Sequence, residues 1–180
     1  MRGHLGKVEV RSVREGEGSM PMQFAVPGVT GEDLAALKPW YWSDELSLDP
    51  QAAIFRIEVR SYLLNVDGLN VLVDTCCGND KQRSVPWAHQ LQTQWLQNLA
   101  GAGCDAGDIH LVLCTHLHAD HVGWNTRLDD GRWVPTFPNA RYVFSRKDFE
   151  FFGRQTQRPV FVHSLGDVVP TRRMPRLLGI

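Results

Sequence analysis

The feature that most constrains this chain is an apolar segment that runs directly into a group of histidines. Residues 108–114, Asp-Ile-His-Leu-Val-Leu-Cys, form a short run of the kind that builds a buried parallel strand. Residues 115–121 then follow as Thr-His-Leu-His-Ala-Asp-His. Histidine and aspartate are costly at the end of a buried strand unless their polar atoms find partners. A divalent cation is a partner that all four side chains can share.

The spacing of these residues indicates how they would share the metal. Alternate residues of an extended segment point to the same side, so His116, His118 and Asp120 are expected to face one way. Gly123 permits a tight turn that brings His121 around to them. We expect His116 and His118 to hold a first metal. The second metal would then be held by Asp120 and His121.

The donor types indicate which metals fit and what they would do. Imidazole and carboxylate suit zinc first, and also manganese, iron or cobalt. Two such ions about 3.5–4 Å apart can share a hydroxide and polarise a carbonyl or phosphoryl oxygen. The other four histidines are isolated in the sequence and are interpreted as solvated or core residues: His4, His89, His110 and His163.

The rest of the sequence predicts a mixed α/β fold, in which strands come first and then alternate with helices. Turn signals at Asp67-Gly68 and Asp130-Gly131 indicate hairpins, and Thr30 begins a capping box. Trp87, Leu91, Trp95 and Leu99 recur at helical spacing. Strands are expected near 7–11, 54–66, 70–74, 108–114 and 140–144, helices at 31–37, 86–100 and 146–153, and a loop at 14–30.

Composition narrows the class of protein. The chain has 180 residues, which fits one domain, and its net charge of −1 argues against nucleic acid or an anionic membrane as partner. It has no apolar run long enough to span a bilayer and no signal-peptide core near Met1, so a cytoplasmic location is expected. The four cysteines show no C-x-x-C pairing and are expected to be free thiols: Cys76, Cys77, Cys104 and Cys114.

At the histidine group the sequence resembles the metallo-β-lactamase superfamily, whose signature is H-x-H-x-D-H. Residues 115–126 and 135–142 resemble its N-acyl-homoserine-lactonase-like and methyl-parathion-hydrolase-like branch, and the resemblance covers about residues 5–155. It implies a four-layer αββα sandwich, of which this chain carries mainly the N-terminal half. It also implies a metal-activated hydroxide, held between two ions, that attacks a small ester, lactone or phosphoester.

The resemblance assigns roles to particular residues. Asp120 is expected to take part in catalysis as well as in metal binding. Asp74, at the end of the second hairpin strand, resembles the superfamily's aspartate beside the metals. We expect its carboxylate to accept hydrogen bonds from the histidine segment and to hold the ligands in orientation.

The chain departs from this family pattern after His121. Relatives of this type have a downstream histidine in a Gly-His turn, a bridging aspartate and a final histidine, whereas only His163 follows here, in an unrelated context. We therefore expect residues 1–155 to be the N-terminal part of the domain and residues 156–180 to be an irregular tail. The alternative function is a truncated, metal-binding but catalytically inactive chain, which persists only with a partner or not at all. A homo-oligomer is one such association.

Two other functions are less favoured. A redox relative with a di-iron site would usually carry glutamate where this chain has His118. A nuclease relative would be expected to show a basic, aromatic-interleaved stretch, which the sequence lacks.

Overall fold

The computed structural model describes residues 1–40, 47–154 and 177–179. The chain divides into two compact units, a larger one of residues 1–16 and 59–180 and a smaller one of residues 17–58. Two long strands, β2 (Val8–Pro21) and β3 (Ile54–Val66), run from one unit into the other.

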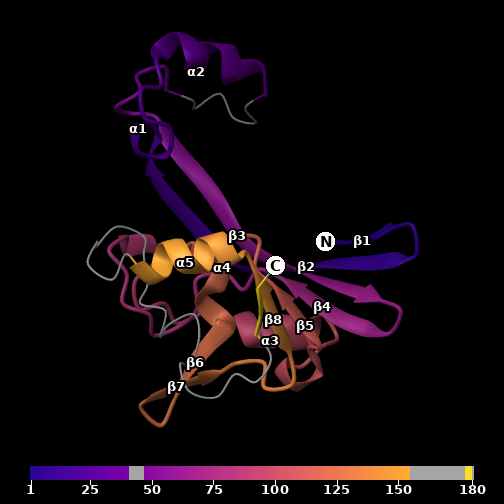
Figure 1. The fold of residues 1–180 in the computed structure, drawn as a ribbon. Helices are drawn as coiled ribbons and strands as arrows, with labels where there is room; N and C mark the ends of the chain where they lie inside the picture. Colours follow the sequence, from indigo (N-terminus) through magenta and orange to yellow (C-terminus); the bar gives the residue numbers. More distant parts are fainter. Residues whose placement is uncertain (41–46, 155–176, 180) are drawn as a thin grey trace. The chain divides into compact units, whose positions relative to one another are not determined.

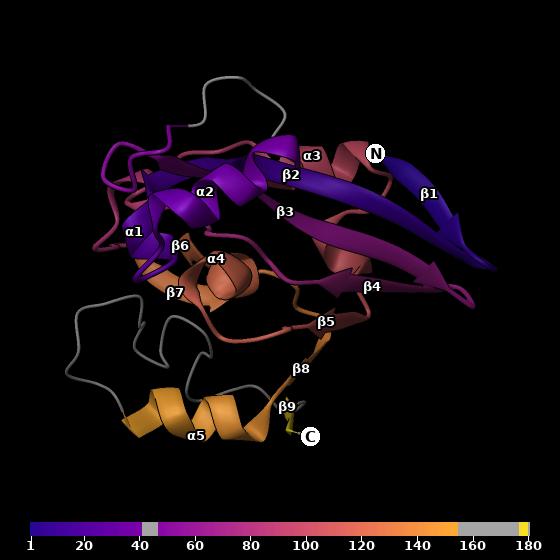
Figure 2. The same ribbon diagram turned by 90° about the horizontal axis from the view of Figure 1, so that it is seen from above.

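A mixed sheet with the strand order β1-β2-β3-β4-β5-β8-β9 organises the larger unit. β1 (Arg2–Leu5) pairs antiparallel with β2, and β3 pairs antiparallel with β4 (Leu69–Val73). β4, β5 (Leu111–Leu113) and β8 (Arg141–Phe144) are parallel neighbours and lie side by side in Figures 1 and 2. Val73 is opposite Leu113 and Leu113 is opposite Val143, so these three strands end at one edge of the sheet.

Aromatic side chains form much of the core of the larger unit. Trp95 in α3 (Trp95–Gly101) is fully buried and stacks on Trp124, with ring centroids 5.5 Å apart. Phe137 meets Trp95 edge to face at 6.2 Å and also contacts Tyr142 of β8. This packing fixes α3 and the segment after the histidine group against the sheet.

Most of the predicted elements are confirmed. The hairpin of β3 and β4 turns at Asp67-Gly68, and a second hairpin, β6 (Thr126–Asp129) and β7 (Arg132–Pro135), turns at Asp130-Gly131. The buried strand before the histidines is β5, and α5 (Arg146–Arg154) begins after Ser145, whose hydroxyl accepts from the Asp148 N–H. The remaining short elements of this unit are η2 (Pro86–Ala88), η3 (Ala106–Asp108), α4 (Ala119–Val122) and η4 (Gly123–Asn125).

The smaller unit contains α1 (Met22–Ala25), α2 (Gly31–Leu37) and η1 (Lys38–Trp40). The predicted capping box is confirmed, because the Thr30 hydroxyl accepts from the Asp33 N–H while the Asp33 carboxylate accepts from the Thr30 N–H. Its small core consists of Met22, Leu34 and Ala53, with Val29 packed against them.

The prediction of a loop at 14–30 is wrong for residues 14–25, because β2 continues to Pro21 and α1 covers Met22–Ala25, and it is confirmed only for residues 26–30, between α1 and α2. Glycine and serine weaken a strand locally, but β2 lies between β1 and β3 in the sheet, and pairing with neighbours outweighs local preference.

The prediction of one helix over 86–100 is also wrong, because only Trp95–Gly101 forms an α-helix. Gln90 adopts a left-handed φ of 46° and its N–H donates to the Lys81 carbonyl, while Leu91 forms a β-bridge with Asn79. These longer-range backbone bonds compete with the helix and interrupt its first half.

The C-terminal segment is described only in part. Residues 177–179 form β9 (Leu177–Gly179), which pairs parallel with β8, although residues 170–180 show no strand periodicity. The proposed boundary between residues 155 and 156 stays a prediction, since residues 155–176, including His163, lie outside the described part of the chain. No helix within the described residues is long and apolar enough to cross a membrane.

Candidate metal centre

The parallel strands bring the predicted site residues together. Because β4 and β5 end at the same edge of the sheet, Asp74 after β4 lies beside the segment that follows β5. In that segment Leu117 and Ala119 are buried, whereas His118 is exposed. The apolar residues thus anchor the segment, and the polar residues that alternate with them are less buried.

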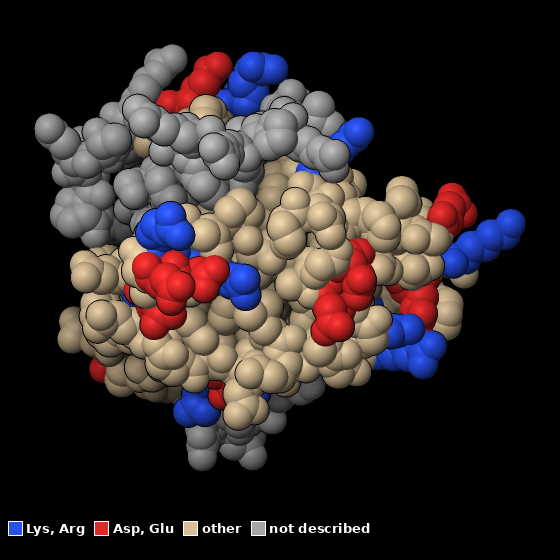
Figure 3. Space-filling model, turned by 90° about the horizontal axis from the view of Figure 1, so that it is seen from below, with Lys and Arg blue, Asp and Glu red and all other residues tan. Residues whose placement is uncertain are grey.

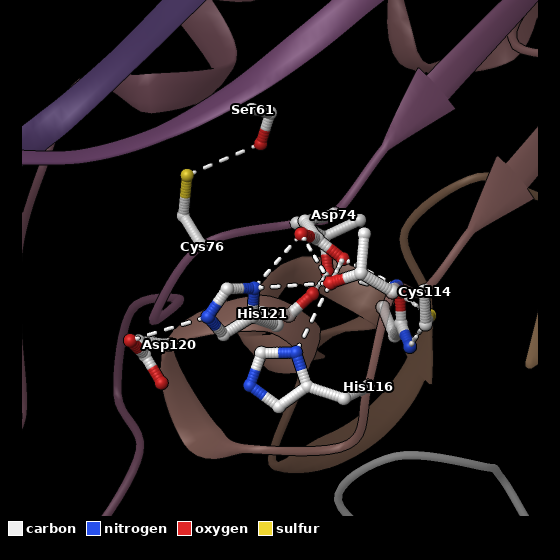
Figure 4. A network of polar contacts seen from close by, with 10 residues as sticks. Ser61, Asp74, Cys76, Cys114, His116, Asp120 and His121 are labelled. Atoms are coloured by element: carbon white, nitrogen blue, oxygen red, sulfur yellow. Dashed lines mark hydrogen bonds and ion pairs between the residues drawn. The ribbon is translucent and has the colours of Figure 1, made fainter. Parts of the chain in front are cut away.

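Asp74 is the centre of a network that holds the start of the histidine segment (Figure 4). Its Oδ1 accepts from the Thr115 N–H at 2.7 Å and its Oδ2 accepts from the Thr115 hydroxyl at 2.8 Å. Its Oδ2 also lies 2.8 Å from Nδ1 of His121. Asp74 has a left-handed φ of 57°, which aspartate tolerates better than most residues, and this backbone directs its carboxylate to the segment.

His121 lies between two carboxylates. Its Nδ1 faces Asp74, and its Nε2 lies 3.4 Å from Oδ2 of Asp120 (Figure 4). Because an ionised carboxylate only accepts hydrogen bonds, Nδ1 carries the hydrogen toward Asp74. The protonated ring also carries a hydrogen on Nε2, which faces Asp120, and a metal ion bound at Nε2 would take the place of that hydrogen.

His116 and His118 complete the cluster. The rings of His116 and His118 meet edge to face, with centroids 4.6 Å apart, and the rings of His116 and His121 are 3.9 Å apart. Nδ1 of His116 lies 3.1 Å from the Thr115 hydroxyl, and His118 also meets the ring of Phe152 at 5.9 Å. All five predicted site residues therefore lie in one region of the larger unit.

The pKa values of these groups follow from their neighbours. Burial by itself lowers the pKa of His121, but the Asp120 and Asp74 carboxylates outweigh burial and raise it to about 9. For both carboxylates burial raises the pKa, and the contact with His121 outweighs it and lowers the pKa. Burial lowers the pKa of His116, and the neighbouring His121 and His118 lower it further. Both carboxylates are thus held ionised, as metal ligands and their supports must be.

The donor geometry fits a divalent cation in part. Two ligands of one tetrahedral zinc ion, each about 2.0–2.2 Å from it, are separated by about 3.3–3.5 Å. The separation of 3.4 Å between Nε2 of His121 and Oδ2 of Asp120 falls in this range. In the described part of the chain no three His, Cys, Asp or Glu residues form a ready-made metal site. The residues present thus supply pairs of potential metal ligands, and Asp74 contacts the pair formed by Asp120 and His121 through His121.

Thr115 is a site residue to which sequence reasoning assigned no role. Its hydroxyl contacts both oxygens of Asp74 and Nδ1 of His116, so it links the supporting carboxylate to the first histidine. Its place directly after the buried strand and before His116 is the signal that would have found it.

The cysteines do not contribute to this site. All four are buried and free, as predicted. Burial raises the pKa of each, to about 12 for Cys114, and Cys76 contacts the Ser61 hydroxyl rather than the histidines. Thiols of this kind are poor nucleophiles at neutral pH.

The smaller unit contains an apolar pocket of about 550 Å³. The carboxylate of Asp33, its one acidic lining residue, is engaged by Thr30. The pocket has no histidine or cysteine and therefore does not resemble a metal site. Its apolar lining includes Met22, Val26, Val29, Ala36, Leu37 and Trp40.

Comparison with known families agrees with the geometry. The sequence matches the metallo-β-lactamase superfamily over residues 56–178, more than half of the chain. The chain therefore belongs to this superfamily. No curated protein matches the sequence.

Solved structures show the same fold. The hydrolase AbOPH of the β-lactamase superfamily has a TM-score of 0.63 at 20% identity, over 84% of this chain and 46% of that protein. AidC, a dizinc quorum-quenching lactonase, has a TM-score of 0.62 at 20% identity, with 84% and 46% covered. A probable metal-dependent hydrolase from Staphylococcus aureus has a TM-score of 0.65 at 20% identity, with 86% and 52% covered. The chain thus has the N-terminal part of the metallo-β-lactamase fold and spans about half the length of these proteins.

Proposed function

We propose that this chain supplies metal-binding residues of a hydrolase that cleaves a small ester, lactone or phosphoester. The observation that carries the proposal is the row formed by Asp74, His121 and Asp120, with contacts of 2.8 and 3.4 Å. Metal-ligating histidines typically donate one ring N–H to a supporting carboxylate and point the other nitrogen toward the metal, where a second ligand such as Asp120 also lies. A solvated surface histidine is not expected to lie between two carboxylates.

Each residue has a part in this proposal. His116 and His118 would hold one cation, and Asp120 with His121 would hold another, zinc being the best match to these donors. Asp74 keeps the Nδ1 hydrogen of His121 in place, so that Nε2 is the nitrogen that would bind the cation in place of its hydrogen. When bound, a divalent cation lowers the pKa of water and polarises a carbonyl or phosphoryl oxygen of the substrate. Asp120 is the carboxylate placed to orient the reacting groups.

A small-molecule substrate is supported by the charge distribution and by the structural relatives. On the face drawn in Figure 3, acidic and basic side chains lie next to one another and form no continuous basic surface among the described residues. Such a surface would favour nucleic acid. AidC was solved with a homoserine product bound, which is a ring-opened lactone and makes a lactone the first substrate to test.

The test is metal-dependent hydrolysis by these 180 residues joined to the C-terminal half of a structural relative such as AidC. A lactone, an aryl ester and a phosphotriester would be assayed with added Zn²⁺, Mn²⁺ or Co²⁺. Hydrolysis should require metal and be abolished by His118→Ala. The control His4→Ala, in the exposed strand β1, should retain it. Hydrolysis that survives both chelation and His118→Ala would refute the proposal. Metal binding without turnover of any substrate would favour the inactive alternative.

A further inference from the structure

Glu15 on β2 is a partly buried carboxylate to which the proposed chemistry assigns no task. Its Oε2 accepts from the Cys77 N–H at 2.7 Å and its Oε1 accepts from the Gly78 N–H at 3.1 Å. Oε1 also accepts from the indole N–H of Trp124 at 2.6 Å and lies 3.4 Å from the Thr93 hydroxyl. The Glu15 carboxylate thus accepts hydrogen bonds from three separate segments of the chain.

Two of these segments carry the site residues at their ends. Cys77 and Gly78 belong to the loop that follows Asp74, and Trp124 follows shortly after His121. The Thr75 N–H donates to the His121 carbonyl at 2.7 Å. The N–H groups of Gly123 and Trp124 donate in turn to the carbonyls of Cys76 and Thr75, at 2.7 and 2.8 Å. The loop after Asp74 and the segment after His121 are therefore bound backbone to backbone.

Glu15 joins this assembly through its two carboxylate oxygens. Two successive N–H groups on the two oxygens of one carboxylate form a charge-assisted pair, which is stronger than a neutral hydrogen bond. Without the carboxylate, the N–H groups of Cys77 and Gly78 would lose their acceptor, which is unfavourable for buried groups. Burial raises the pKa of Glu15 and these N–H donors oppose the rise, so the fold bears a cost to keep the group there.

We propose that Glu15 is a positioning residue of the metal centre, whose carboxylate fixes the loop after Asp74 against the segment after His121. The inference rests on the proposed metal site. We call the Glu15 carboxylate and its hydrogen bonds to Cys77, Gly78 and Trp124 the clamp. Without the clamp the two segments can shift, which disturbs the 2.8 Å contact between Asp74 and His121 and hence the direction of Nε2.

The test compares Glu15→Gln with Val13→Ala in the full 180-residue chain. Glutamine keeps the size of the side chain but turns one acceptor into a donor that faces N–H groups. Val13 lies on the same strand and is fully buried, so Val13→Ala lowers stability without touching the clamp. Both variants would be loaded with Co²⁺, whose visible absorption reports the ligand geometry, and their thermal stability would be measured alongside.

We expect Glu15→Gln to weaken Co²⁺ binding by about 10–100-fold and to change the absorption spectrum, as loss of a support behind metal ligands does. Val13→Ala should lower thermal stability and leave both readouts unchanged. If Glu15→Gln fails to fold, Trp124→Phe provides a second test. It keeps an aromatic ring against Trp95 but removes the indole N–H, so it should produce a smaller change in the same direction.

Two outcomes would overturn the inference. One is that the Glu15 and Trp124 variants bind Co²⁺ with unchanged affinity and spectrum, which would leave Glu15 a purely structural role. The other is that Val13→Ala weakens binding as much as Glu15→Gln does, because affinity would then follow general stability. Failure of the metal site itself would look different, since the unmodified chain would bind Co²⁺ no better than a variant with all four ligand residues replaced by alanine.

Discussion

At the residue scale, Asp74 is a side chain that would support the proposed metal ligands without being a ligand itself. Its carboxylate makes three hydrogen bonds with Thr115 and one contact with His121, and it is nearly buried. It reaches them from a left-handed backbone at the end of β4. In the proposed site, a group in this position would control which nitrogen of His121 binds the metal and which way the ring faces.

Asp74→Ala should therefore lower affinity for Zn²⁺ by about 10–100-fold. The matched control is Asp67→Ala in the hairpin turn. Asp67 also has a left-handed φ, of 49°, so both substitutions cost the same kind of backbone strain. Asp67 is exposed and lies at the far end of β4 from Asp74, so its loss should leave the affinity unchanged. Competition with a chromophoric chelator would measure both. Equal affinities for the two variants would remove Asp74 from the site.

At the element scale, the loop after β4 and the turn after α4 interlock through two glycines. A Cβ on Gly123 would lie 1.8 Å from the Cys77 carbonyl oxygen, and a Cβ on Gly78 would lie 2.6 Å from the Gly123 carbonyl carbon. The atoms that each added Cβ would approach belong to the backbone, which cannot shift without a substantial cost in free energy. This close approach is what allows three backbone hydrogen bonds to form between the two segments.

Gly123→Ala should accordingly destabilise the fold by about 1–3 kcal/mol or more, as overpacking does. It should also weaken metal binding, because His121 lies two residues before the clash. Gly101→Ala, at the end of α3, is the control: its Cβ would meet nothing within 4 Å, so stability should stay the same or rise slightly. Urea unfolding of both variants checks this. A Gly123→Ala variant as stable as the Gly101→Ala variant would show that the segments can separate without cost.

At the scale of the whole molecule, the number of metal ligands limits the metal affinity and hydrolytic activity expected of these 180 residues. In the proposed site the cluster would supply two ligands to each of two cations, whereas a catalytic zinc ion normally has three protein ligands and one open position. Only one histidine, His163, follows His121 in the sequence, outside the described part of the chain. The solved relatives are about twice as long as the matched region.

The 180-residue chain by itself should therefore bind metal loosely and hydrolyse lactones or phosphotriesters little above background. Metal content by mass spectrometry after gel filtration, with turnover on the same sample, measures both. The same residues joined to the C-terminal half of a relative should gain tight binding and turnover. Tight two-metal stoichiometry and strong lactonase activity in the 180-residue chain alone, lost on His118→Ala, would contradict this prediction.

The sequence by itself determined the features that depend on neighbouring residues. The hairpin at Asp67-Gly68, the capping box at Thr30 and the buried strand before His116 follow from local turn chemistry, capping and hydrophobic pattern. That His116, His118 and Asp120 share one side is a prediction from their spacing, and Leu117 and Ala119, which alternate with them, are buried. The superfamily follows from the same residues.

Only the tertiary structure decided the features that join distant segments. β2 extends through a glycine-rich stretch because neighbouring strands pair with it, and the helix expected from residue 86 is interrupted by backbone bonds to residues 79–81. Glu15 meets Trp124 across 109 positions of sequence. No local preference encodes such a contact, because the donors that offset the cost of burying this carboxylate come together only in the folded chain.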